Sequence, residues 1–373
     1  MGNYCAPARE GQKGHKAASQ SLHDHPVDNV SSDDDKQQQS LPRLHDGKAI
    51  NSVNVVDDEN VVTCGEDGGV SILNWRTGTV VADWRGSASV SRVTCGTVRR
   101  DCYSCSRDLT IQQWRRGEND PVQVLKGHEL SINALAVSSD EAKLCSGSRD
   151  YTVRIWDLAA QKEVVQSKIN RNVVTCCRWL GASEPALVAQ GSEDLTVRVW
   201  DTRGLSMRCE QTLKGFVYFP LSMDTSSDGR YILTGGKGFS AGNGADVKLW
   251  DRRSIDKPLH EMSGHSLDVK GVSFLPVCSG LNEGRLAIAS ASKDQSIRIW
   301  DQATGDQMAE WSAGGGMFTS MAALSHIDDS IGVNKSYGNM LLCAVTFWGS
   351  IYIYNTEGKC IKQHHVETNP ALE

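Results

Sequence analysis

Two segments of the chain contain a histidine, a serine and an aspartate, the side-chain types that form a catalytic triad. Each segment ends in a tryptophan, and the two sets are His128, Ser146, Asp150 and Trp156, and His265, Ser290, Asp294 and Trp300. In both sets the tryptophan follows the serine by 10 residues. A pattern that recurs at a fixed offset favours a structural role, because an active site is needed only once. We therefore predict no catalytic residue and no enzyme activity.

The cysteines and a glycine-rich stretch are the other candidates for chemistry. Twelve cysteines in 373 residues are too sparse for a disulfide framework, and Cys102 and Cys105 form a C-x2-C without a second pair. We expect buried thiols in a reducing compartment and no metal site. The stretch Gly235–Gly244 lacks the G-x-x-x-x-G-K-[ST] pattern of a phosphate loop, so we expect an elongated turn and no cofactor.

The bulk composition excludes some classes of partner. The formal net charge is −6 and the isoelectric point about 5.9, so no basic field attracts nucleic acid. No apolar run approaches the length of a membrane span, and no signal-peptide core follows the N-terminus. We expect a soluble, intracellular, cytoplasmic protein, unless a lipid anchors it to a membrane.

A tryptophan followed by an acidic or basic residue recurs along the chain and divides it into repeats. The pairs are Trp114-Arg115, Trp156-Asp157, Trp200-Asp201, Trp250-Asp251 and Trp300-Asp301, at intervals of 42, 44, 50 and 50 residues. Leu73-Asn74 and Tyr354-Asn355 are degenerate copies that bring the number to seven. The spacing is close to the period of four short strands in a propeller blade.

The third copy predicts strands at residues 132–137, 144–148, 152–156 and 163–167, with a turn at Arg149-Asp150. Alternating apolar and polar residues between polar turns are typical of antiparallel strands. One small sheet is barely stable, whereas seven sheets stacked around an axis bury their faces. The fold class predicted is therefore all-β, a seven-bladed propeller.

The propeller is expected to span residues 41–366, between two tails. Residues 1–40 contain Asp33-Asp34-Asp35 and Gln37-Gln38-Gln39 and almost no branched aliphatic residues, which predicts a disordered tail. Residues 367–373 form a short second tail. Either Ser40–Leu44 or Cys360–His365 supplies the outer strand of the last blade; we slightly favour the second, because it follows its third strand at the ordinary spacing.

The two sets of four residues resemble those of the WD40-repeat family, and the resemblance covers roughly residues 44–366. It implies a hydrogen-bonded tetrad in the third and sixth copies, in which aspartate bonds histidine, histidine bonds serine, and serine bonds the indole N–H. It also implies a non-enzymatic scaffold that binds proteins or peptides. Such a tetrad has a physical reason, since a buried carboxylate and a buried indole N–H each need a partner. The segments 171–175, 192–205 and 235–249 resemble a group of small scaffold propellers connected with trafficking in ciliated cells.

The resemblance further implies that partners bind the face formed by the turns between second and third strands. The turn positions expected on this face are Glu66, Arg107, Arg149, Glu193, Lys293 and Phe347, and the inner-strand positions are Asn51, Ser91, Asn133, Thr175, Leu221, Lys270 and Thr319. Arg107 and Arg149, beside Asn133, suit a carboxylate or phosphate held by two hydrogen bonds. We expect an acidic or phosphorylated partner segment; the alternative is a mixed-charge rim that only faces solvent.

Two consecutive W-D-x-R sequences end in Arg203 and Arg253. They resemble the boxes by which substrate receptors of cullin-type ubiquitin ligases contact their adaptor. Ordinary turn chemistry also produces Asp-x-Arg after a strand, so both interpretations stand.

The N-terminal residues include two candidates for lipidation. Gly2 is placed for myristoylation and Cys5 for palmitoylation, and two lipids would hold a membrane where one would not. Ala6 departs from the preferred serine or threonine, and a Met-Gly start also arises by chance.

Overall fold

The computed structural model describes residues 44–168, 172–181, 184, 186–239, 244–275, 286–312, 316–326, 339–355 and 357–364. The chain divides into two units, Met1–Ser40 and Leu41–Glu373, and the fold described is that of the second. The expected tails, 1–40 and 367–373, lie outside the described residues, as do Gly2 and Cys5.

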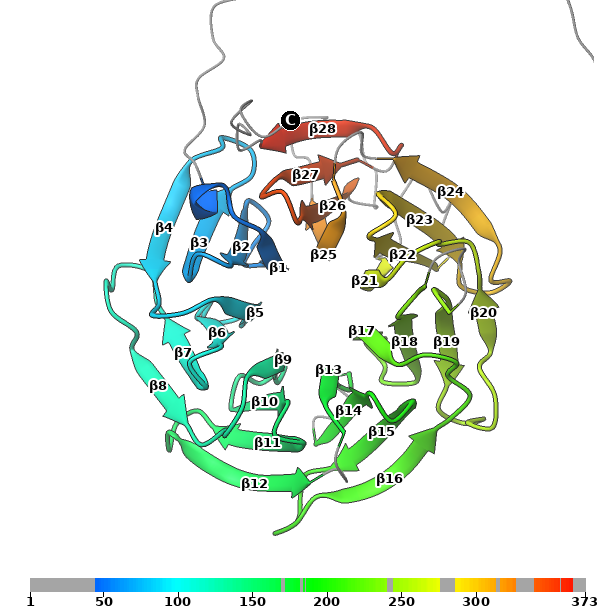
Figure 1. Ribbon diagram of the computed structural model, residues 1–373, viewed down its shortest axis with the longest axis horizontal. Helices are drawn as coiled ribbons and strands as arrows, with labels where there is room; N and C mark the ends of the chain where they lie inside the picture. Colours follow the sequence, from blue (N-terminus) through cyan, green and yellow to red (C-terminus); the bar gives the residue numbers. More distant parts are fainter. Residues whose placement is uncertain are drawn as a thin grey trace, which may run out of the picture. The chain divides into compact units, whose positions relative to one another are not determined.

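Seven four-stranded antiparallel sheets are arranged around a central axis, so the predicted seven-bladed all-β propeller is confirmed (Figure 1). Blade 1 comprises β1 (Ile50–Val55), β2 (Asn60–Gly65), β3 (Gly69–Asn74) and β4 (Val80–Arg85). Blade 2 comprises β5 (Val90–Cys95), β6 (Cys102–Ser106), β7 (Thr110–Trp114) and β8 (Gln123–Lys126). Blade 3 comprises β9 (Ile132–Val137), β10 (Lys143–Ser148), β11 (Thr152–Asp157) and β12 (Lys162–Lys168).

The remaining blades continue in chain order. Blade 4 comprises β13 (Val174–Trp179), β14 (Leu187–Ser192), β15 (Thr196–Asp201) and β16 (Arg208–Leu213). Blade 5 comprises β17 (Pro220–Thr225), β18 (Tyr231–Gly236), β19 (Val247–Asp251) and β20 (His260–Met262). Blade 6 comprises β21 (Val269–Leu275), β22 (Ala287–Ser292), β23 (Ser296–Asp301) and β24 (Gln307–Ser312). Blade 7 comprises β25 (Phe318–His326), β26 (Asn339–Thr346), β27 (Ile351–Tyr354) and β28 (Cys360–His364).

Each blade consists of four consecutive strands, with the first next to the axis and the fourth at the rim (Figure 1). The outer strand of blade 7 is β28, so the C-terminal segment completes the last blade. Leu44 begins a short 3-10 turn (η2, Leu44–Gly47) and is not part of an outer strand. Among the described residues, therefore, no blade combines strands from the two ends of the chain.

The core lies between the blades. Seven clusters of buried apolar side chains are present, one at each interface between neighbouring blades. The interface that closes the ring joins Ile50 and Val53 of blade 1 to Leu324 and Val345 of blade 7. Across it, Ser320 Oγ also lies 3.3 Å from the backbone nitrogen of Val53. The ring is thus closed by side-chain packing and not by a shared sheet.

Candidate functional site

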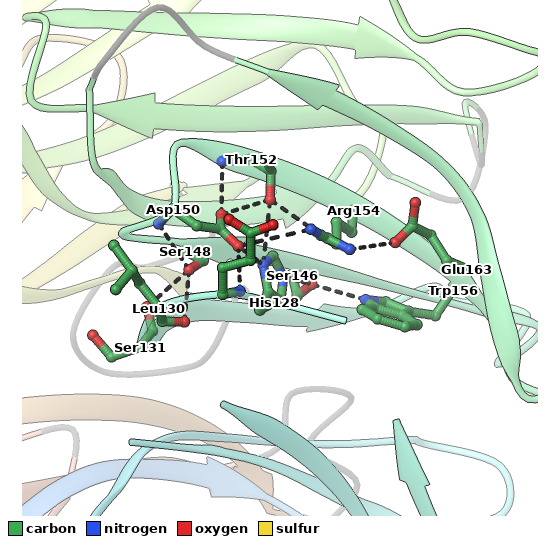
Figure 2. A network of polar contacts seen from close by, with 11 residues as sticks. His128, Leu130, Ser131, Ser146, Ser148, Asp150, Thr152, Arg154, Trp156 and Glu163 are labelled. Atoms are coloured by element: carbon green, nitrogen blue, oxygen red, sulfur yellow. Dashed lines mark hydrogen bonds and ion pairs between the residues drawn. The ribbon is translucent and has the colours of Figure 1, made fainter. Parts of the chain in front are cut away.

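The His–Ser–Asp set of blade 3 forms a continuous chain of hydrogen bonds (Figure 2). His128 Nδ1 lies 2.7 Å from Asp150 Oδ2, and His128 Nε2 lies 2.7 Å from Ser146 Oγ. Trp156 Nε1 donates to the same hydroxyl at 2.8 Å. Asp150 also accepts the backbone N–H groups of Glu129 and Thr152, and so ties the loop before β9 to the turn after β10.

Blade 6 repeats this arrangement. His265 Nδ1 lies 2.9 Å from Asp294 Oδ2 and its Nε2 lies 2.8 Å from Ser290 Oγ, which accepts the indole N–H of Trp300 at 2.8 Å. Ser290 is fully buried, as is Ser146 in blade 3. Each hydroxyl lies between a histidine and a tryptophan and has no exposed surface for a substrate, so both sets act as braces inside their blades.

The carboxylates of these braces are held in the ionised state. Burial alone would raise the pKa of Asp150, but hydrogen bonds from His128 and Thr152 outweigh it and hold that pKa well below its ordinary value. The pKa of Asp294 is lowered in the same way, by hydrogen bonds from His265 and Ser296.

Blade 1 contains a related brace that sequence reasoning missed. His45 Nδ1 lies 2.9 Å from Asp67 Oδ1, and His45 Nε2 lies 2.9 Å from Thr63 Oγ1. The sequence places Leu73 where blades 2 to 6 have tryptophan, so the tetrad lacks its fourth member. The threonine in place of serine concealed the pattern, although His45 and Asp67 keep the separation of 22 residues seen in blade 3.

Three other blades keep only part of the tetrad. Trp114 donates to Ser104 at 2.8 Å in blade 2, and Trp200 donates to Gln190 at 3.2 Å in blade 4. In blade 5 the indole nitrogen of Trp250 is buried and has no hydrogen-bond partner among the described residues. The braces therefore differ from blade to blade, while the sheets do not.

A second recurring feature lies at the start of every inner strand, where the register with the second strand shifts by one residue. The residues left unpaired at these seven bulges are Asn51, Ser91, Asn133, Thr175, Leu221, Lys270 and Thr319. They are the seven inner-strand positions expected from the sequence. A β-bulge turns a side chain out of the regular alternation, and here all seven residues line one cavity at the end of the axis.

The residue that follows each second strand lies at the same end of the blades. In every blade its backbone N–H donates to a carbonyl of the loop that precedes the inner strand, and these residues are Glu66, Arg107, Arg149, Glu193, Lys237, Lys293 and Phe347. Lys237 is the blade 5 member, which the sequence did not reveal because the segment after it is longer than in other blades. Its ammonium group lies 4.8 Å from the ring centre of Phe219 and 5.3 Å from that of Phe239.

We call the cavity lined by the bulged residues the mouth cavity; its volume is about 420 Å3. Of the expected partner-binding residues, it brings together Arg107, Asn133, Arg149, Glu193, Lys270 and Lys293. Glu66 and Phe347 do not line it. The lining also includes Arg92, which was not expected, so five cationic side chains face one carboxylate.

Two lysines at the mouth share one aspartate. Lys293 Nζ lies 2.9 Å from Asp268 Oδ2, whereas Lys270 Nζ lies 3.7 Å from the same atom. Burial lowers the pKa of Lys270 to about 8, against the attraction of Asp268, and the positive charges of Lys293 and Arg92 add to that decrease. The mouth cavity thus contains more positive charge than its own carboxylates neutralise.

Arg203 and Arg253 lie at the opposite end of the blades, in the turns after the third strands β15 and β19. Arg203 Nε lies 2.9 and 3.0 Å from the two carboxylate oxygens of Asp201. Arg253 Nε donates to Asp251 Oδ1 at 3.1 Å, and Arg253 Nη2 donates to Asp251 Oδ2 at 2.9 Å. Their side chains are 69% and 66% exposed, so each guanidinium is oriented by its own turn and presented to solvent.

Other kinds of site were also considered. Within the described ranges, no group of three or more His, Cys, Asp or Glu side chains is placed to hold a metal ion. The ten cysteines in this part of the chain are all unpaired thiols. None of the described helical residues forms a segment with the length and apolar character needed to span a bilayer.

Comparison with known proteins identifies repeats in this chain. Residues 119–157 and 256–301 match the WD40 family, described as WD domain, G-beta repeat. The matches end with the third strands of blades 3 and 6, the two blades with complete tetrads. The chain therefore contains WD40 repeats.

Several curated proteins are similar over about half of the chain. Nuclear distribution protein nudF of Aspergillus niger is 25% identical over 58% of this chain and 40% of its own length. The Ribosome biogenesis protein WDR12 homolog of Nematostella vectensis is 24% identical over 53% of this chain and 51% of its own. Nuclear distribution protein PAC1 of Arthroderma benhamiae is 33% identical over 48% of this chain and 29% of its own length. The chain thus spans about half or less of these relatives.

Proposed function

We propose that this propeller with WD40 repeats is a non-enzymatic scaffold for protein–protein interactions, and that its mouth cavity binds an acidic or phosphorylated segment of a partner. The observation that carries the proposal is the lining of the cavity, where five cationic side chains face the single carboxylate of Glu193. A rigid ring of blades supports this lining, so a partner binds a surface that is already formed.

The two rim arginines are the sharpest test of this proposal. Reversing both charges, with Arg107→Glu and Arg149→Glu, should abolish capture of at least one partner in quantitative pull-downs, because the cavity would then repel an acidic segment. Both side chains are exposed, so the fold should tolerate the change. An unchanged set of partners would contradict the proposal.

A second candidate function uses the opposite end of the blades, as a substrate receptor of a cullin-type ubiquitin ligase. It is favoured by Arg203 and Arg253, which adjacent blades present in the same exposed Asp–Arg geometry. The ligase adaptor should then co-purify with the protein and be lost from the Arg203→Ala, Arg253→Ala double variant. This pair also serves as the control for the mouth variant, because it removes two arginines far from the cavity.

Location forms a separate part of the proposal. The segments 171–175, 192–205 and 235–249 resemble WD repeat-containing protein 31, and on this resemblance we place the scaffold in the cytoplasm with a role in trafficking in ciliated cells. We also propose that it reaches membranes through lipids on Gly2 and Cys5. Proximity labelling that compares the intact protein with Gly2→Ala tests both parts. Equal labelling of membrane proteins by the two proteins would contradict the lipid anchor. Absence of ciliary proteins among the labelled neighbours would contradict the location.

A further inference from the structure

Arg92 is a cationic side chain in the axial channel, and no carboxylate of the described residues forms an ion pair with it. It follows the bulge of β5, and its Nε lies 3.3 Å from the carbonyl oxygen of Asn133 in blade 3. Its Nη2 lies 3.5 Å from the carbonyl oxygen of Leu221 in blade 5. Because blades 2 and 5 lie on opposite sides of the ring, the guanidinium group spans the axis (Figure 1).

Within the described part of the chain, no carboxylate is among the main electrostatic influences on Arg92. Burial is the largest cause that lowers the pKa of this residue, and the positive charge of Arg178 adds to it. The nearby titratable groups of opposite sign are the thiols of Cys176, Cys105 and Cys64, whose own pKa values are raised by burial. Thiols in that state are neutral at pH 7, so they do not compensate the charge of Arg92.

Lys270 adds a second cation from blade 6. It lines both the mouth cavity and the narrow part of the channel, of about 40 Å3, and so does Arg92. The aspartate nearest to Lys270 is Asp268, which already accepts the closer Lys293 at 2.9 Å and the backbone N–H of Gly238 at 3.1 Å. Two partly sheltered cations thus meet at the floor of the mouth cavity.

The other end of the channel differs in charge. It opens into a cavity of about 360 Å3, where Arg178 lies 3.9 Å from Asp224. The positive charge of Arg178 is therefore paired with a carboxylate at this end of the channel, whereas the mouth end carries excess positive charge. The mouth cavity, at about 420 Å3, falls within the roughly 300–1,000 Å3 that is usual for ligand sites.

We infer that the floor of the mouth cavity is a binding site for a phosphate monoester, held by Arg92 and Lys270 and carried on a serine or threonine of the partner segment. That the phosphate is carried by a partner protein rests on the proposed function, whereas the phosphate site itself does not. A phosphate monoester brings a charge of about −1.5 to −2 and three acceptor oxygens, which suit a guanidinium fork and an ammonium group together. A carboxylate brings one charge and would leave one of these cations uncompensated.

The test uses the purified full-length chain and titrates it with O-phosphoserine, inorganic phosphate and glutamate, followed by calorimetry and 31P NMR. We expect O-phosphoserine to bind and glutamate to bind far more weakly. Arg92→Met and Lys270→Met should each weaken O-phosphoserine binding about tenfold or more, because each removes a hydrogen bond between charged groups. Arg178→Met is the matched control in the same channel and should bind as the unchanged protein does.

A second variant guards against loss of the fold. Arg92→Lys keeps a cation on β5 and should retain part of the binding, and melting curves of all variants identify any that are unfolded. Equal binding of glutamate and O-phosphoserine, or full binding by folded Lys270→Met, overturns the inference. If inorganic phosphate binds but no member of a phosphoserine peptide library does, the inference that the phosphate is carried on a partner protein is overturned. Phosphoserine binding without any partner loss in the Arg107→Glu, Arg149→Glu protein would contradict the proposed function alone.

Discussion

At the scale of single residues, the serine of each tetrad has two buried partners to satisfy. Ser146 Oγ accepts the indole N–H of Trp156 and bonds His128, and no solvent reaches it. Blade 5 differs: Thr234, at the equivalent register position, donates to the Lys248 carbonyl at 3.4 Å and to no other partner among the described residues. We therefore expect side chains at this position to contribute different amounts to the free energy of unfolding in different blades.

Ser146→Ala should lower the free energy of unfolding by about 1–3 kcal/mol, because the variant leaves an imidazole nitrogen and an indole N–H buried without a partner. Thr234→Val, which keeps the side-chain volume and removes only the long hydrogen bond, is the control and should cost less. Urea denaturation followed by tryptophan fluorescence measures both. An equal cost for the two variants would contradict the role given to the tetrad.

The lowered pKa values of Asp150 and Asp294 link stability to pH. Their folded-state pKa lies below the ordinary value of 3.8, so their contribution to stability is present above about pH 4 and is lost as the pH falls through the folded-state value. The Asp150→Asn, Asp294→Asn double variant should therefore be less stable at pH 7 and should lose less stability between pH 7 and pH 3. Ser146→Ala keeps both carboxylates and should keep the slope of the unchanged protein. Parallel pH profiles for the Asn variant and the unchanged protein would exclude this linkage.

At the scale of strands and turns, the sequence predicted most where the repeats are regular. The four strands expected in blade 3 agree with β9–β12 to within one residue at each end, since their polar turns are short and their alternation is clear. The seven inner-strand positions expected at the binding face all prove to be bulged residues. Bulges recur because the blades recur, so a repeat alignment finds the positions without revealing the bulge itself.

Other features depend on contacts between distant segments, which a repeat pattern does not contain. The brace of His45, Thr63 and Asp67 was hidden by a threonine and by a missing tryptophan. Lys237 was missed because a longer segment follows it. Arg92 lies one residue beyond a bulge, and only the opposition of blades 2 and 5 across the axis places its guanidinium group in the channel. No periodicity in the sequence indicates that geometry.

The outer strand β28 gives a testable prediction at this scale. Every residue of β27 is buried, and β28 pairs along it from Ile351 to Tyr354. Ending the chain after Gly358 should lower the melting temperature and cause aggregation, because an apolar strand edge would be left unpaired. A chain ended after His364 keeps β28 and should melt near the unchanged protein. If the two truncated proteins have equal melting temperatures and equal solubility, β28 is not needed to complete blade 7. That result would contradict our account of how the ring is closed.

At the scale of the whole molecule, the two ends of the propeller differ in charge and in how far their cationic side chains are paired with carboxylates. At the mouth, five cationic residues line one cavity with a single carboxylate. At the other end, Arg203 and Arg253 are each held by a neighbouring aspartate, and Arg178 lies beside Asp224. An acidic partner therefore gains most by approaching the mouth, where its charge replaces a counterion that the protein does not supply.

Blade 4 offers the most direct measurement of this claim, because Glu193 and Arg203 lie at opposite ends of β15 and are both exposed. A photo-crosslinking amino acid placed at either position samples one face of the same blade in living cells. We predict that position 193 yields crosslinks to acidic or phosphorylated segments of partner proteins, lost when Arg107 and Arg149 are changed to glutamate. Partners captured only from position 203, with no crosslink from position 193, would contradict the account.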